Sequence, residues 1–142
     1  MYKKVFLDAN VLVDVYDLSR PFSDVSKEAL FFLLQDERVA LFTSCDIITT
    51  IYYLRAEENK EKALDDIIKI NDFCHIIEFG NTEVTKSCRL MKQNKQFTDL
   101  EDTIQYVMAK KIEADLILSN DSSFVSDGID LMSTEQFCKT HL

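Results

Sequence analysis

Glycine, proline and histidine are scarce in this chain of 142 residues, and tryptophan is absent. Two glycines and one proline exclude long flexible linkers and the glycine-rich loops that hold nucleotide phosphates. Two histidines leave little material for imidazole-based catalysis. The G-x-S-x-G motif of serine hydrolases is also missing. Any chemistry of this chain therefore has to come from other side chains.

The cysteines show no metal-binding arrangement. They include no C-x-x-C pair and stand far apart in the chain, at Cys45, Cys74, Cys88 and Cys138. Cys74 lies beside His75, but neighbouring side chains of a strand point to opposite faces, so this pair is a poor chelate. Buried, reduced thiols are therefore expected in place of a zinc site.

Acidic residues outnumber basic ones by 25 to 16, which gives a formal net charge of −9. Such a chain lacks the basic surface of a passive nucleic-acid-binding domain. The charge argues less against a metal-dependent nuclease, because a metal ion neutralises clustered carboxylates. No apolar run approaches the roughly 18 residues that span a membrane. We therefore expect one domain over residues 1–142, cytoplasmic and without a membrane anchor.

Apolar strands alternate with amphipathic helices along the chain. Strands are expected at residues 4–7, 39–43, 74–79, 115–119 and 129–132. Helices are expected at residues 10–17, 24–35, 45–54, 63–71, 82–92 and 98–112, and after residue 133. Hydroxyl side chains are expected to cap four of them, at Ser23, Ser44, Thr98 and Ser133. Strands separated by helices pair in parallel, with helices on both faces. The expected fold is a three-layer α/β/α sandwich around a parallel sheet of four to five strands.

Acidic residues stand where expected strands end. Asp8 follows the first strand, and Asp121 lies just beyond the fourth. Ligands bind outside the carboxyl ends of parallel strands where the strand order reverses, so both carboxylates are expected at one crevice. Asp102 lies in the first turn of the helix that precedes the fourth strand, and Asp99 shares its face. Carboxylates held together repel, and a hard cation such as Mg²⁺ or Mn²⁺ relieves the repulsion and activates water.

Each of these acids also has a purely structural interpretation. Asp8 could cap the helix that follows it, and Asp121 could be an ordinary turn residue before two serines. Asp99 and Glu101 could stabilise the N-terminus of a helix. Asp102 is the hardest to explain in this way, because the predicted capping box is complete without it. A phosphatase with Asp8 as nucleophile is disfavoured, because the residue two positions later is asparagine and not a second acid.

Three segments together resemble the PIN-domain family, and within it the bacterial branch of toxins from toxin–antitoxin pairs. Residues 5–12, VFLDANVL, are similar to the opening D-x-N motif of that family. Residues 98–106, TDLEDTIQY, resemble its acidic helix start, and residues 118–124, LSNDSSF, resemble its T-N-D-x-x-F motif. The resemblance implies an endoribonuclease that depends on Mg²⁺ or Mn²⁺ and acts on RNA. It also implies an antitoxin protein as partner, and frequent homodimers.

The resemblance assigns roles to particular residues. Asp8, Asp102 and Asp121 are implied to be catalytic and to hold the metal, with Asp99 as a further ligand. Supporting roles fall to Asn10, Thr50, Glu101, Ser119 and Asn120. Thr50 is a departure, because the family usually has a glutamate there and a neutral hydroxyl is a weaker ligand. An alternative therefore stays open, in which a catalytically weak or inactive PIN fold acts as a protein- or RNA-interaction module.

Overall fold

The computed structural model describes residues 2–142 and has a wholly parallel, five-stranded sheet at its centre. The strands are β1 (Lys4–Leu7), β2 (Ala40–Ser44), β3 (Cys74–Ile77), β4 (Leu116–Leu118) and β5 (Asp130–Met132). Their order is β3-β2-β1-β4-β5. The chain therefore moves outward from β1 to β3 on one side, then returns and adds β4 and β5 on the other. The strand order reverses at β1, where a ligand site is expected in such a sheet.

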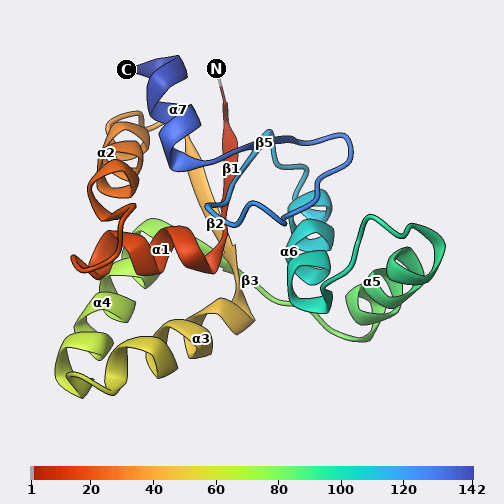
Figure 1. The fold of residues 1–142 in the computed structure, drawn as a ribbon, viewed down its shortest axis with the longest axis horizontal. Helices are drawn as coiled ribbons and strands as arrows, with labels where there is room; N and C mark the ends of the chain where they lie inside the picture. Colours follow the sequence, from red (N-terminus) through yellow and green to blue (C-terminus); the bar gives the residue numbers. More distant parts are fainter. Residues whose placement is uncertain (1) are drawn as a thin grey trace.

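Seven helices connect and cover the strands of the described chain. They are α1 (Ala9–Tyr16), α2 (Ser23–Leu34), α3 (Cys45–Ala56), α4 (Lys60–Phe73), α5 (Asn81–Gln93), α6 (Leu100–Lys111) and α7 (Thr134–His141). Figure 1 shows α1, α2, α4 and α7 on one side of the sheet and α5 and α6 on the other. Among residues 2–142, no helix is long and apolar enough to cross a membrane.

Alternating side chains of the central strands divide the core between the two faces. Val5 and Leu7 of β1 join the apolar cluster under α1, α2, α3 and α4, while Phe6 joins the cluster under α6. In β4, Leu116 and Leu118 likewise face the first cluster. All of these side chains are essentially inaccessible to solvent. This alternation is the two-residue period of a strand buried on both faces, and it confirms the expected α/β/α sandwich.

The predicted cap at Ser23 is wrong. The Phe22 carbonyl already accepts the Ser26 N–H at 2.9 Å, so the helix begins at Ser23 itself. The Ser23 hydroxyl is buried and has no hydrogen-bond partner among the described residues. The turn at Arg20 therefore sets the start of α2 through its backbone and not through a side-chain cap.

The serines before α3 and α7 behave differently. Ser44 stands at the predicted N-cap position of α3, but its hydroxyl donates to the Asp46 carboxylate and makes no capping bond. Ser133 accepts the Gln136 N–H at 3.1 Å, and the Gln136 side chain accepts the Ser133 N–H in return. The capping box predicted at Ser133 is thus confirmed.

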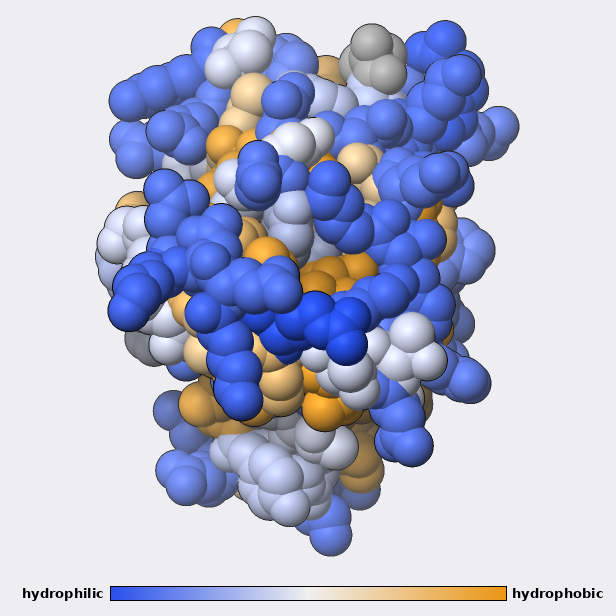
Figure 2. All heavy atoms as spheres, turned by 90° about the vertical axis from the view of Figure 1, so that its right-hand side faces the viewer, coloured by the Kyte–Doolittle hydropathy of each residue, from blue (hydrophilic) through white to orange (hydrophobic). Residues whose placement is uncertain are grey.

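All four cysteines are free thiols, as expected, but they are not all buried. Cys74 is buried, and burial raises the pKa of its thiol to about 12. Cys88 is exposed, because α5 packs on α6 through a narrow face on which Ser87 is the only buried residue of the helix. The outer surface on this side of the molecule is mostly hydrophilic, with apolar side chains visible in between (Figure 2).

Candidate active site

A pocket of about 360 Å³ opens at the carboxyl ends of β1 and β4. Its walls come from the segment after β1, the loop after β4, α3 and the start of α6. Five acids line it: Asp8, Asp99, Glu101, Asp102 and Asp121. Their proximity follows from the strand order, because β1 pairs directly with β4 and Leu7 lies opposite Leu118. The structure therefore brings together every acid that the sequence singled out.

Asp8 lies at the floor of this acidic pocket and is 5% exposed. One carboxylate oxygen accepts the Ala9 N–H at 2.8 Å, which caps α1. The other accepts the Ser119 hydroxyl at 2.8 Å and the Asn10 side-chain amide at 3.0 Å. The capping interpretation of Asp8 is thus correct. Its second carboxylate oxygen does not take part in the cap and points to Ser119 and Asn10 at the pocket floor.

Burial and mutual repulsion raise the pKa of carboxyls in the acidic pocket, most of all those of Asp8 and Asp102. Burial raises the pKa of Asp8 to about 6, opposed by its hydrogen bonds and helped by the charges of Asp121 and Glu101. Burial raises the pKa of Asp102 to about 7, together with the charges of Asp8, Asp121 and Asp99. A positive charge placed between such carboxyls stabilises their charged form and offsets their repulsion. The pocket is therefore electrostatically suited to a cation.

Asp99 caps α6, and Thr98 does not. The Asp99 carboxylate accepts the Asp102 N–H at 2.9 Å, and the helix begins at Leu100. The predicted box from Thr98 to Glu101 is therefore wrong by one residue. The carboxylate of Asp99 is an even better acceptor for the free N–H groups of a helix start than a hydroxyl. Its capping bond occupies one carboxylate oxygen, as the bond from the Ala9 N–H does for Asp8.

Asp121 is exposed at the rim of the acidic pocket and forms a local turn. One of its carboxylate oxygens accepts the Ser123 N–H at 2.9 Å and the Ser123 hydroxyl at 2.7 Å. Its own N–H donates to the Ser119 hydroxyl at 3.2 Å. The turn interpretation of Asp121 is correct, and the turn orients the carboxylate beside Asp8 and Asp102.

Thr50 lines the acidic pocket, where its hydroxyl donates to the Asp46 carbonyl at 3.3 Å. Asp46, one turn earlier on α3, was not singled out from the sequence. The pKa of Glu101 is raised, mainly by partial burial and further by the negative charges of Asp46 and Asp99. The side-chain amide of the buried Gln105 donates to the Asp46 carboxylate at 3.3 Å. Asp46 of α3 therefore adds negative charge near the acidic pocket, although Thr50 itself carries none.

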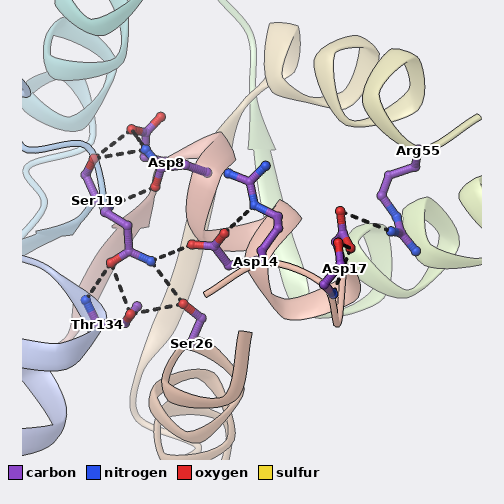
Figure 3. A network of polar contacts seen from close by, with 11 residues as sticks. Asp8, Asp14, Asp17, Ser26, Arg55, Ser119 and Thr134 are labelled. Atoms are coloured by element: carbon purple, nitrogen blue, oxygen red, sulfur yellow. Dashed lines mark hydrogen bonds and ion pairs between the residues drawn. The ribbon is translucent and has the colours of Figure 1, made fainter. Parts of the chain in front are cut away.

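Two asparagines connect the pocket floor to the helices around it. The Asn10 side-chain oxygen accepts the Asn120 N–H at 2.8 Å. The Asn120 side-chain amide donates to Asp14 at 2.7 Å and to Ser26 at 3.0 Å, and its oxygen accepts the Thr134 N–H at 2.9 Å. Figure 3 shows this network running from Asp8 to Thr134. Asn120 therefore connects the end of β4 to α1, α2 and α7, and these bonds fix the position of the next residue, Asp121.

Asp14 and Arg20 are the parts of the network that sequence reasoning missed. Asp14 is 1% exposed and forms an ion pair with Arg20, which also lines the acidic pocket. The signal was present in the sequence, because Asp14 is the one acid within the apolar stretch of α1. The charge of Asp14 is satisfied by Arg20 and by the Asn120 side-chain amide.

The residues present fit a divalent cation held largely through water. The side chains of the acidic pocket that can coordinate a metal offer oxygen atoms and include no thiol or imidazole, which suits Mg²⁺ or Mn²⁺ and not a thiol-preferring metal. Within residues 2–142, no three Asp, Glu, His or Cys side chains stand close enough to coordinate one ion directly. Mg²⁺ commonly binds through one or two carboxylates and keeps several waters. Asp8, Asp102 and Asp121 offer this looser arrangement.

The fold and sequence match known proteins over most of the chain. The model of the PIN domain matches residues 4–123. Ribonuclease VapC1 of Aquifex aeolicus (strain VF5) is 47% identical over 137 residues, which covers 96% of this chain and 94% of that protein.

Two solved structures show the same fold. VapBC2 from Rickettsia felis, bound to a DNA fragment from its promoter, gives a TM-score of 0.72 at 16% identity and covers 92% of this chain and 98% of its own. Mycobacterium tuberculosis VapC20, described as a Sarcin-Ricin loop cleaving toxin, gives 0.68 at 11% identity and covers 84% of this chain and 92% of its own. At this identity the structures establish the fold alone. Together with the family match and the 47% identical relative, they show that the chain belongs to the PIN domain family.

Proposed function

We propose that this protein is a metal-dependent endoribonuclease. The observation that carries the proposal is the convergence of Asp8, Asp102 and Asp121 on one pocket at the point where the strand order reverses. The raised pKa values of Asp8 and Asp102 support it, because a bound cation would relieve the burial of charge and the repulsion that raise them. The name of the A. aeolicus relative, a ribonuclease, supports RNA as the substrate.

The chain supplies binding and orientation for this chemistry. Asp8, Asp102 and Asp121 would hold Mg²⁺ or Mn²⁺, with Asp99 and Glu101 adding negative charge at the rim. A cation held there would supply the positive charge that activates water and stabilises charge on the phosphate. Ser119 and Asn10 keep the Asp8 carboxylate in place through their hydrogen bonds. The Thr50 hydroxyl can also accept a hydrogen bond from a water in the pocket. Asn120 holds the loop after β4 in a fixed position through its side-chain hydrogen bonds.

The proposal includes an antitoxin as protein partner. Large apolar side chains are exposed on α3, α4 and the loop after α1, at Leu18, Tyr53, Leu54, Leu64 and Ile68. Tyr53 is 73% exposed and Leu18 is 71% exposed. Exposed apolar patches on small proteins commonly mark interfaces with other proteins. Light scattering of the protein alone and with the product of an adjacent short gene would distinguish a homodimer from a complex of the two proteins.

Cleavage assays with matched variants test the enzymatic proposal. A single-stranded RNA is incubated with Mn²⁺, with and without EDTA, for the wild type and for Asp8→Asn, Asp102→Asn and Asp121→Asn. Asp65→Asn is the control, because this acid is exposed on α4 outside the pocket. We expect cleavage by wild type and Asp65→Asn only, and only without EDTA.

Two outcomes would contradict the proposal. Cleavage that persists in EDTA, or in Asp8→Asn, would rule out a metal held by this pocket. Absence of cleavage together with absence of Mn²⁺ binding in calorimetry would favour the alternative of an inactive PIN fold that serves as an interaction module. The departure at Thr50 is the sequence feature that motivates this alternative.

A further inference from the structure

A second pocket adjoins the acidic one and shares Asp121 with it. It measures about 480 Å³ and lies between the loop after β4, the start of α2 and the start of α7. Apolar walls come from Phe22, Phe124 and Leu131, and polar ones from Ser122 and Gln136. Because the residue Asp121 lines both pockets, a chain-like molecule bound at the acidic pocket can reach the second one.

The charge of this second pocket selects the kind of group that fits. No lysine or arginine lines it, and its two charged residues, Asp121 and Glu135, are both acidic. A phosphate group would therefore be repelled. Phe22, by contrast, is 41% exposed and contributes its aromatic side chain to the wall of the second pocket. An uncharged, planar group that stacks on an aromatic ring suits these walls.

We propose that the second pocket binds a nucleobase next to the phosphate that is cleaved, with the base stacked on Phe22. This inference rests on the proposed function, since an RNA chain provides both the base and the phosphate. Proteins that recognise single-stranded RNA hold unstacked bases on aromatic side chains in this way. Phe22 then is a residue that determines where along an RNA the enzyme cuts.

Two polar side chains are placed to contact the edge of such a base. Gln136 uses its side-chain oxygen to accept the Ser133 N–H at 2.9 Å, which leaves its NH₂ group to donate to a base acceptor. Ser122 contributes a hydroxyl from the exposed loop after Asp121. Asn120 also lines the pocket, but its side chain is fully used in the network with Asp14 and Thr134. Base preference should therefore depend on Gln136 and Ser122.

The absence of tryptophan from the chain makes a direct binding test available. The variant Phe22→Trp places a single tryptophan in the pocket, and its fluorescence, excited at 295 nm, is followed during titration with AMP, UMP and ribose 5-phosphate. These probes contain no phosphodiester bond to be cleaved. The control is Phe31→Trp, because Phe31 is also on the α2 side and exposed but does not line the pocket.

We expect saturable quenching of Phe22→Trp by AMP and UMP, and none by ribose 5-phosphate. The Phe31→Trp control should show only a small, linear response. Equal responses of the two variants would overturn the proposal. So would quenching by ribose 5-phosphate comparable to that by AMP, since the phosphate and not the base would then be the bound group.

Cleavage by Phe22→Ala and Phe31→Ala tests the same site through activity. Loss of one stacked base weakens binding by roughly 10-fold or more. We expect Phe22→Ala to raise KM by about that factor with kcat nearly unchanged, and to alter the pattern of cut positions, while Phe31→Ala matches the wild type. An unchanged KM and cutting pattern in Phe22→Ala would overturn the proposal. If the wild type cleaves no RNA, the ribonuclease assignment fails, and the fluorescence titration still decides whether the pocket binds a base.

Discussion

Ser119 donates its hydroxyl hydrogen to the Asp8 carboxylate over 2.8 Å and so joins the ends of β4 and β1 at the floor of the acidic pocket. The same hydroxyl accepts hydrogen bonds from the Asn10 side chain at 3.3 Å and from the Asp121 N–H at 3.2 Å. One buried side chain therefore positions two of the three proposed metal ligands.

Replacing Ser119 by alanine should impair metal binding more than it disturbs the fold. Asp8 loses a hydrogen bond that favours its charged form, and Asp121 loses its backbone anchor. Groups that orient metal ligands typically contribute 10- to 100-fold in metal affinity or activity. We expect a loss of about 10-fold in Mn²⁺ affinity by calorimetry, and a drop of roughly 1–2 kcal/mol in the free energy of unfolding in urea. Thr49→Ala, which removes an exposed hydroxyl on α3, should change neither quantity. An unchanged Mn²⁺ affinity in Ser119→Ala would contradict the positioning role.

Removal of the Asp102 charge should stabilise the metal-free protein at high pH. The pKa of Asp102 is raised from its ordinary value of 3.8 to about 7, so the folded state binds this proton more tightly than the unfolded state. The folded protein therefore loses stability relative to the unfolded chain as the pH rises from about 4 to about 7, and the full penalty is present above that range. Asp102→Asn removes the penalty.

In EDTA at pH 8 we expect Asp102→Asn to be more stable than wild type by roughly 1–2 kcal/mol, a value reduced for solvent screening of a half-buried group. At pH 4.5 the difference should nearly vanish, and with saturating Mn²⁺ at pH 8 the order should reverse. Thermal unfolding of both proteins under these three conditions measures the difference in stability. A stability difference that does not depend on pH would show that Asp102 acts through packing and not through charge.

The position of the acidic pocket was predictable because it depends on features that a sequence displays directly. Apolar runs marked the strands, their alternation with helices implied parallel pairing, and the acids Asp8 and Asp121 followed two of the runs. The structure confirms the layers and places both acids at the strand ends. No detail of side-chain packing was needed for these steps.

What could not be predicted depends on which side chains meet in space. Asp46 lies 55 positions before Glu101, and only the folded chain brings their charges within range of each other. The pairing of Asp14 with Arg20 requires the turn after α1 to fold back. The cap of α6 was misplaced by one residue because threonine and aspartate stand side by side there and both are good caps.

Restoring an acid at Thr50 should strengthen metal binding. Thr50 lines the acidic pocket, so a glutamate there adds a carboxylate beside Asp8 and Asp102. A higher ligand charge raises cation affinity, and we expect Thr50→Glu to lower the Kd for Mn²⁺ by roughly 10-fold. The control Thr49→Glu adds the same charge at the neighbouring, exposed position outside the pocket and should have a much smaller effect. Equal gains for the two variants would mean that the added charge acts at long range and not as a ligand.

A cationic cleft between α5 and α6 should contribute to RNA affinity. The cleft measures about 480 Å³ and is lined by Lys86, Arg89, Lys110 and Lys111. Residues 81–97 carry four basic side chains and one acidic one, a net charge of +3 in a chain with a net charge of −9. Phosphate contacts by such side chains give binding that weakens with salt and does not depend on sequence.

We expect Arg89→Glu to weaken binding of every single-stranded RNA by a similar factor, about 5-fold or more at low salt, and to flatten the dependence of log K on log salt. The matched control is Lys69→Glu, a charge reversal at an exposed position on α4. Fluorescence anisotropy at several salt concentrations measures both quantities. If Lys69→Glu has the same effect as Arg89→Glu, only the net charge matters and the cleft has no specific role.

The buried ion pair of Arg55 and Asp66 should be a sensitive point of the fold outside the acidic pocket. Their side chains are 8% and 3% exposed and approach to 3.2 Å, and Figure 3 shows Arg55 reaching also toward Asp17. Arg55→Ala leaves Asp66 charged and buried, which costs about 3–5 kcal/mol. Arg38→Ala, which breaks the exposed pair with Asp36, should cost less than about 1 kcal/mol.

The double variant Arg55→Met/Asp66→Leu separates the loss of the pair from the burial of an unpaired charge. Apolar replacement of both partners removes the uncompensated charge and the cost of desolvating the two ions. We therefore expect the double variant to regain most of the free energy of unfolding that Arg55→Ala loses, as measured in urea. A double variant as unstable as Arg55→Ala would mean that the pair contributes through the shape of its packing. In that case Arg55 and Asp66 would stabilise the α3–α4 hairpin by filling space in its core, as Ile51 and Ile70 do.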